Sequence, residues 1–186
     1  GRVFKSDDTR PKYYNSHDHA YFNKGSVLFG LDIAKKIIQQ KEAVFVVEGY
    51  MDAIMMVQYG FENTVATLGT ACTQDHLKQI SRYAQNLFLL YDGDNAGQKA
   101  IIRLTKMCWE FNLDIFVVNL PKSEDPASYL GQGKDLRELI DKAQDIFLFF
   151  ISSLSQDFKD KSLQEKMGLT KEILETISLI PDPVKL

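Results

Sequence analysis

The chain has 186 residues, of which 45% are hydrophobic and 25% charged, and its formal net charge is −3. This length suits one sizeable core or two small ones, and the composition excludes a fibrous or low-complexity chain. No apolar run reaches the length of a membrane span and no signal peptide is present, so we expect a soluble cytoplasmic protein without membrane contact. Cys72 and Cys108 lie far apart without a CxxC partner, which excludes a zinc site and is typical of a reducing compartment.

The charge is distributed unevenly. Residues 1–40 contain seven Lys/Arg and four Asp/Glu, a balance of +3, whereas the remainder contains 15 and 21, a balance of −6. Residues 1–30 interleave basic and aromatic side chains with little periodicity, which predicts a loop-rich end of a preceding subdomain. This basic segment is compatible with phosphate-backbone binding and equally with an ordinary solvated surface. Because the chain opens with Gly1 and stops without a clear ending, we expect a fragment of a longer protein.

The first regular elements lead to an acidic turn. Residues 31–41 carry apolar side chains on one face and predict a helix, and the apolar run at 43–47 predicts a strand buried on both faces. Glu48 follows this strand directly, and Gly49 permits the sharp turn into the next helix. Asp52 lies in the first turn of that helix, where the dipole favours an acid, so it is either a helix-start residue or a site residue.

A second acidic turn follows a second buried strand. After a short strand at 64–67 and a helix over 73–84, in which we interpret His76 as a surface residue, the run at 87–91 predicts a strand that ends at Asp92-Gly93-Asp94. Paired carboxylates at this position suit a hard divalent cation and repel each other without one. Taken alone, they are equally explained as residues that shape the turn and cap the next helix.

A helix over 95–111, a strand at 115–118 and a third acidic turn with Glu124 and Asp125 complete the alternation. Such alternation predicts an α/β fold, a mainly parallel sheet flanked by helices, with the carboxyl ends of the strands at one edge. The three acidic turns converge at that edge, where open α/β sheets bind ligands. A divalent-metal site explains three such turns better than helix capping does.

The remainder of the chain is helical in pattern. Residues 146–151 are dense in apolar side chains and predict a buried helix, and a further helix over 161–179 ends before Pro181. We therefore expect a small helical subdomain packed on the sheet.

Two of the acidic turns carry the motifs of a known family. Residues 46–52 (VVEGYMD) and 91–97 (YDGDNAG) together resemble a TOPRIM domain, and the specific combination resembles bacterial DnaG-type primases more than TOPRIM proteins in general. The flanking and internal stretches at 11–16, 22–31, 66–70 and 180–184 resemble the same family, so the resemblance covers nearly the whole chain. It divides the chain into the end of a basic N-terminal subdomain with a linker helix (1–40), the TOPRIM domain (41–130) and a truncated helical subdomain (131–186).

The resemblance implies synthesis of short RNA primers on single-stranded DNA by metal-dependent transfer from NTPs during replication. By that match the catalytic residues are Glu48, Asp92 and Asp94, and the carboxylates that bind Mg²⁺ or Mn²⁺ are these three with Asp52 and Asp125. The groove for template or incoming nucleotide would be lined by Arg2, Lys12, Asn15 and Lys24. The replicative helicase is an implied partner through a domain outside this chain.

One position departs from the family. Asp125-Pro126-Ala127 stands where the family has Asp-Pro-Asp, which removes a carboxylate from that side, and Glu124 has a different spacing.

Two other interpretations stay open. Another TOPRIM protein, a nuclease or a topoisomerase fragment, would share these turns, although a topoisomerase needs a nucleophilic tyrosine and the sequence indicates none. A fragment without the family's zinc-binding and helicase-interacting domains would bind metal and nucleic acid without synthesis. We expect the fragment to be a monomer.

Overall fold

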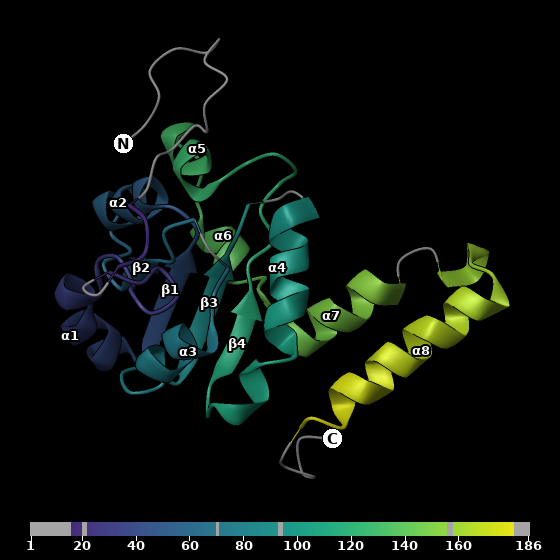
Figure 1. Cartoon of the computed structure of the whole chain (residues 1–186). Coiled ribbons are helices and arrows are strands. Elements are labelled where there is room, and N and C mark those ends of the chain that lie inside the picture. Colours follow the sequence, from purple (N-terminus) through teal and green to yellow (C-terminus); the bar gives the residue numbers. More distant parts are fainter. Residues whose placement is uncertain (1–15, 20–21, 70, 93–94, 156–157, 181–186) are drawn as a thin grey trace.

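A computed structural model of the chain describes residues 16–180, except 20–21, 70, 93–94 and 156–157 (Figure 1). Five strands form one sheet in the order β2-β1-β3-β4-β5. They are β1 (Ala43–Val47), β2 (Thr64–Ala66), β3 (Asn86–Leu90), β4 (Asp114–Val117) and β5 (Gln144–Asp145). All neighbours are parallel except β5, which runs antiparallel to β4. The mainly parallel sheet expected from the sequence is therefore confirmed.

The helices alternate with the strands as far as β4. They are α1 (Leu31–Lys41), α2 (Tyr50–Gln58), α3 (Gln74–Ile80), α4 (Asn95–Thr105), α5 (Pro126–Gly131), α6 (Arg137–Ile140), α7 (Ile146–Ser155) and α8 (Leu163–Ile177). After β4, α5 and α6 precede β5, and α7 and α8 follow it. The helix predicted over 95–111 ends earlier, at Thr105, and a short 3-10 helix at Cys108–Glu110 follows it.

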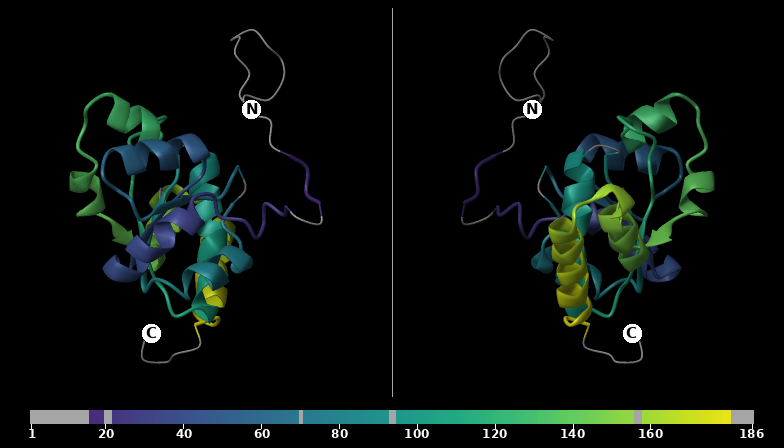
Figure 2. Two further views of the ribbon diagram at one scale, coloured as in Figure 1. Left: turned by 90° about the vertical axis from the view of Figure 1, so that its left-hand side faces the viewer. Right: turned by 90° about the vertical axis from the view of Figure 1, so that its right-hand side faces the viewer.

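The sheet is buried on both faces, because successive side chains of a strand point to opposite sides. In β1, Val44 and Val46 join a core with residues of α1, α3, α4 and α7. Phe45 and Val47 join a second core with residues of α2, α5 and α6. Figure 2 shows from two sides how the helices enclose the sheet. Burial on both faces explains why β1 and β3 are continuous apolar runs.

The C-terminal part lies beside this layered body. α7 packs against α4 and β4, and α8 contacts α7 on the outside of the molecule (Figure 1). An ion pair of 2.7 Å joins Lys106 Nζ to Glu172 Oε1 of α8. α6 packs on the sheet and β5 extends it, although both lie in the predicted helical subdomain of residues 131–186. The division into three domains therefore stays a prediction. Among the described residues, the helices are too short or too polar to span a bilayer.

Candidate acidic site at the carboxyl ends of the strands

The first acidic side chain, Glu48, is positioned by the end of β1. The register pairs Val47 of β1 with Leu90 of β3, so both strands end at the same level. The backbone N–H of Asp92, two residues after β3, donates to Glu48 Oε1 at 3.3 Å. The loop after β2 is tied to the same turn, because the N–H of Gly69 donates to the carbonyl of Glu48 at 3.0 Å. The ends of β1, β2 and β3 therefore meet at Glu48.

Among the described carboxylates of the site, Asp52 is the most buried, with 9% of the residue exposed. Its Oδ1 accepts the N–H of Ala127 at 3.3 Å, and its carboxylate also accepts a hydrogen bond from the backbone of Gly49. Burial, followed by the nearby charges of Asp125 and Asp92, raises the pKa of Asp52 to about 6. Asp52 is therefore close enough to Asp92 and Asp125 to be affected by their charges. Its hydrogen bonds from the backbone of Gly49 and Ala127 connect the turn after β1 to the start of α5.

The third acidic turn is organised as a helix start. Asp125 is the N-cap of α5, and its Oδ1 accepts the N–H of Ser128 at 2.6 Å. The hydroxyl of Ser128 donates to Glu124 Oε2 at 2.6 Å, and Gln132 donates to the same carboxylate. These hydrogen bonds lower the pKa of Glu124. Glu124 is thus engaged with its own helix and does not replace the carboxylate missing at Ala127.

Tyr91 lies beneath the turn that carries Asp92 and is 3% exposed. Its hydroxyl accepts the N–H of Cys72 at 3.0 Å and also interacts with Thr67, so it joins the end of β3 to the loop after β2. Burial raises the pKa of Tyr91 well above its usual value and that of Cys72 to about 12. A buried, protonated phenol is unsuited to act as a nucleophile, so the site offers no support for Tyr91 as a topoisomerase tyrosine.

One sequence interpretation was wrong. His76 is completely buried, not on the surface. Its ring Nδ1 accepts the backbone N–H of Thr73 at 3.2 Å, and the backbone N–H of His76 donates to Thr73 Oγ1 at 3.2 Å. This pair of hydrogen bonds forms the capping box of α3. The spacing of Thr73 and His76, N-cap and N3, was the sequence signal that this histidine has a local partner.

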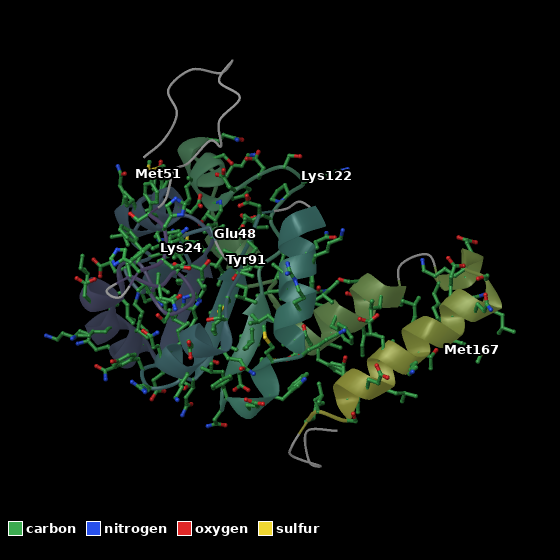
Figure 3. The ribbon with its side chains drawn as sticks, in the orientation of Figure 1. Lys24, Glu48, Met51, Tyr91, Lys122 and Met167 are labelled. Atoms are coloured by element: carbon green, nitrogen blue, oxygen red, sulfur yellow. The ribbon has the colours of Figure 1, made fainter. Side chains whose placement is uncertain are left out.

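Several predicted site residues lie outside the described residues: Asp94, Arg2, Lys12 and Asn15. Lys24 is described and lies in a turn before α1, where its N–H donates to Asp18 Oδ1 at 3.0 Å. Figure 3 labels Lys24, Glu48 and Tyr91 and shows the last two close to the ends of the central strands.

The oxygen donors at this edge have the chemistry that Mg²⁺ or Mn²⁺ requires, since hard divalent cations bind carboxylates. Within residues 16–180, apart from the gaps named above, no three His, Cys, Asp or Glu residues form a ready metal-binding group. Asp94 lies outside these residues. Burial is the main cause of the raised pKa of Asp52, and repulsion from Asp125 and Asp92 adds to it. A bound cation would relieve this repulsion.

Comparisons with known proteins agree with this geometry. Residues 45–130 match a family described as Toprim-like. The DNA primase of Clostridium acetobutylicum is 37% identical over 187 residues, covering 100% of this chain and 31% of that protein. A DNA primase domain from Pseudomonas aeruginosa superposes with a TM-score of 0.83 at 33% identity, covering 97% of this chain and 57% of that chain.

A structure of a DnaG primase catalytic domain bound to ssDNA gives a TM-score of 0.81 at 30% identity, covering 96% of this chain and 59% of that one. The chain spans 31–32% of the length of three curated relatives, among them a DNA primase of Chlamydia muridarum at 32% identity. These likenesses place the chain in the family of DnaG-type DNA primases, as a segment of the catalytic core that contains the Toprim-like domain.

Proposed function

We propose that this chain is the part of a DNA primase core that carries the acidic site for RNA primer synthesis on single-stranded DNA. The observation that supports this most is the hydrogen bond of 3.3 Å between the N–H of Asp92 and Glu48 Oε1, which ties two acidic turns together at adjacent strand ends. Nucleotidyl transfer develops negative charge on the attacking 3′-hydroxyl and on the leaving pyrophosphate. An acidic edge that binds divalent cations is suited to that chemistry.

Glu48, Asp92 and Asp94 would bind Mg²⁺ or Mn²⁺, which when bound neutralises the developing charge and orients the triphosphate. Asp125 has one oxygen engaged as a helix cap, so its other oxygen is the one free to contribute on that side. Asp52 has backbone donors from two different turns. We therefore assign Asp52 to positioning the Glu48 turn against the Asp125 turn rather than to metal binding.

The nucleic-acid side of the proposal rests on the basic segment. Arg2, Lys12, Asn15 and Lys24 would supply counter-charges and hydrogen bonds to the template or incoming nucleotide. A related DnaG catalytic domain has been solved bound to ssDNA, which supports a single-stranded template here. NTPs as substrates, the cytoplasm as the compartment and a helicase partner, bound through a domain outside this chain, belong to the same proposal.

Primer synthesis is the direct test. The full-length parent protein, this chain and the Glu48→Gln variant of the parent would be compared on single-stranded DNA with ribonucleotides and Mg²⁺ or Mn²⁺. Glu62→Gln, at an exposed position after α2, is the matched control. We expect Glu48→Gln to lower synthesis by about 100-fold or more, the size typical for loss of an acid–base or charge-stabilising group, while the control stays active.

The alternatives predict different results. Cleavage of nucleic acid without nucleotides, combined with no synthesis by the parent, would assign the chain to the nuclease branch of the Toprim proteins. Synthesis by the parent but not by this chain would show that the missing regions are needed, and the chain would then be a binding segment on its own.

A further inference from the structure

The turn that carries Lys24 is attached to α3 by partly buried side-chain contacts. Its internal hydrogen bonds are local: Gly25 N–H to Asn23 Oδ1 at 2.8 Å, and Ser26 N–H to the Asn23 carbonyl at 3.0 Å. Exposed local bonds of this kind contribute little net stability each. They shape the turn but do not fix where it lies against the sheet.

Two side chains of the α3 region provide that attachment. The hydroxyl of Thr73, the N-cap of α3, donates to the carbonyl of Gly25 at 2.6 Å. Gln79 Nε2, two turns further along, donates to the carbonyl of Ser26 at 2.5 Å. Both bonds join residues about 50 positions apart in the chain. The carbonyls of Gly25 and Ser26 therefore both accept hydrogen bonds from side chains of α3 and its N-cap.

His76 completes the contact from beneath. Because its Nδ1 accepts the N–H of Thr73, the ring proton of the neutral form resides on Nε2. Nε2 is buried and has no hydrogen bond of good geometry within the described part of the chain. The backbone of Lys24 and of Val27 lies close enough to the ring to raise its pKa, which partly opposes the larger lowering by burial. The imidazole is thus packed against the inner side of the Lys24 turn.

The same end of α3 is connected to the acidic site. Cys72, next to the N-cap, donates its N–H to the hydroxyl of Tyr91 at 3.0 Å, and Tyr91 immediately precedes Asp92. Gly69, at the start of that loop, donates its N–H to the carbonyl of Glu48 at 3.0 Å. A short series of hydrogen bonds therefore runs from the acidic turns through the loop before α3 to the turn that carries Lys24.

We propose that Thr73, His76 and Gln79 are positioning residues that fix the turn carrying Lys24 relative to the acidic turns and thereby set the affinity for single-stranded DNA or nucleotide. This inference rests on the proposed function. It predicts that loosening the contact raises the KM for template or nucleotide while kcat changes little, because the acidic turns stay in place.

The test uses the full-length parent protein with Thr73→Val, Lys24→Ala and the two combined. Binding to a labelled single-stranded DNA oligomer and the KM and kcat of primer synthesis are measured for each. We expect Thr73→Val to weaken binding several-fold in the wild-type background and to have no further effect in the Lys24→Ala background. Thr73→Ser, which keeps the hydroxyl, should restore affinity.

Loss of a helix cap needs its own control. Ser162 caps α8 with the same kind of capping box and lies far from Lys24 in the chain, so Ser162→Ala should leave binding unchanged. Gln79→Met is the second variant, since it removes the bond to Ser26 without touching the cap. Hydrogen exchange of the amides of residues 23–27 should accelerate in Thr73→Val and Gln79→Met but not in Ser162→Ala.

The results separate the inference from the proposed function. The inference alone would be overturned if Thr73→Val weakened DNA binding equally in the wild-type and Lys24→Ala backgrounds. It would also be overturned if Thr73→Val left DNA binding unchanged although Lys24→Ala binds poorly. Unchanged binding by Lys24→Ala would reject the proposed role of Lys24, and with it the inference built on that role.

Discussion

Gly97 of α4 packs directly against the backbone of Asp92, so closely that no side chain fits between them. A Cβ at Gly97 would collide with the carbonyl oxygen of Asp92 and would stand 3.3 Å from its carbonyl carbon and 3.4 Å from its nitrogen. The clash is with backbone, which cannot swing aside as a flexible side chain can. The absence of a side chain at Gly97 therefore lets α4 begin immediately above the turn that carries Asp92.

Gly97→Ala should accordingly destabilise the chain by about 1–3 kcal/mol, the usual cost of overpacking. Gly168 is the matched control, because it lies in the interior of α8 and a Cβ there would meet nothing within 4 Å. Gly168→Ala should stabilise by about 0.5–1 kcal/mol through helix propensity. Urea unfolding measures both, and equal stability changes for the two variants would contradict the packing assigned to Gly97.

The repulsion among the acids gives a second prediction. Asp92 raises the pKa of Asp52, so its negative charge is unfavourable to that neighbour. Asp92→Asn combined with Asp94→Asn should raise the free energy of unfolding in EDTA by less than about 1.4 kcal/mol, the equivalent of one pKa unit, because burial and Asp125 affect Asp52 more than Asp92 does. Mg²⁺ or Mn²⁺ should stabilise the wild type by mass action and the double variant much less.

The control for this pair is Asp141→Asn with Asp160→Asn, at two exposed positions away from the site. It should change neither the metal-free stability nor the response to metal. Strong destabilisation of the Asp92/Asp94 variant in EDTA would instead favour the interpretation of these residues as turn-shaping caps.

A third prediction concerns the different roles proposed for Asp52, which positions two turns, and Asp92, which binds the metal. Asp52→Asn keeps one carbonyl oxygen for the N–H of Ala127 but loses the second acceptor, so the two turns should separate slightly. We expect Mn²⁺ affinity within about threefold of the wild type and kcat of the parent lower by about 10- to 100-fold, as misplacement of catalytic groups costs. Asp92→Asn should weaken Mn²⁺ binding itself. Similar losses of Mn²⁺ affinity in both variants would make Asp52 a metal ligand.

Much of this site could be predicted because burial leaves a strong mark on sequence. β1 and β3 are buried on both faces, so they are apolar runs, and the acids that follow stand out at their ends. Contacts between distant segments leave no such mark. The hydrogen bond from Ala127 to Asp52 joins residues 75 positions apart, and β5 is a two-residue strand with exposed polar side chains. Neither has a periodicity from which it could be predicted.

The burial of His76 likewise could not be predicted from the sequence. A lone histidine among polar neighbours is typical of a solvated helix, and only the tertiary fold brings the Lys24 turn over it. Its spacing from Thr73 indicated the local cap but not the burial. The buried side of a seven-residue helix is too short a pattern to distinguish from chance.

Burial of His76 predicts how stability depends on pH. Burial lowers its pKa below the ordinary value of 6.5, and this effect exceeds the opposing effects of the Lys24 and Val27 backbone and of Asp75. Above pH 6.5 the histidine is neutral in both the folded and the unfolded chain, so its contribution to stability is complete. Below that pH the unfolded chain binds a proton that the folded chain does not, and the free energy of unfolding falls until the folded-state pKa is passed.

The comparison of wild type with His76→Gln isolates this contribution, because Asp52, whose pKa is raised to about 6, gives an opposite slope that both proteins share. We expect the wild type, relative to the variant, to lose stability between pH 7 and pH 5 with a slope that approaches but does not exceed about 1.4 kcal/mol per pH unit, the value for one proton. Urea unfolding at several pH values in EDTA provides the measurement. Parallel curves for the two proteins would mean that His76 titrates alike in the folded and unfolded chain, and would contradict its burial as a neutral ring beneath the Lys24 turn.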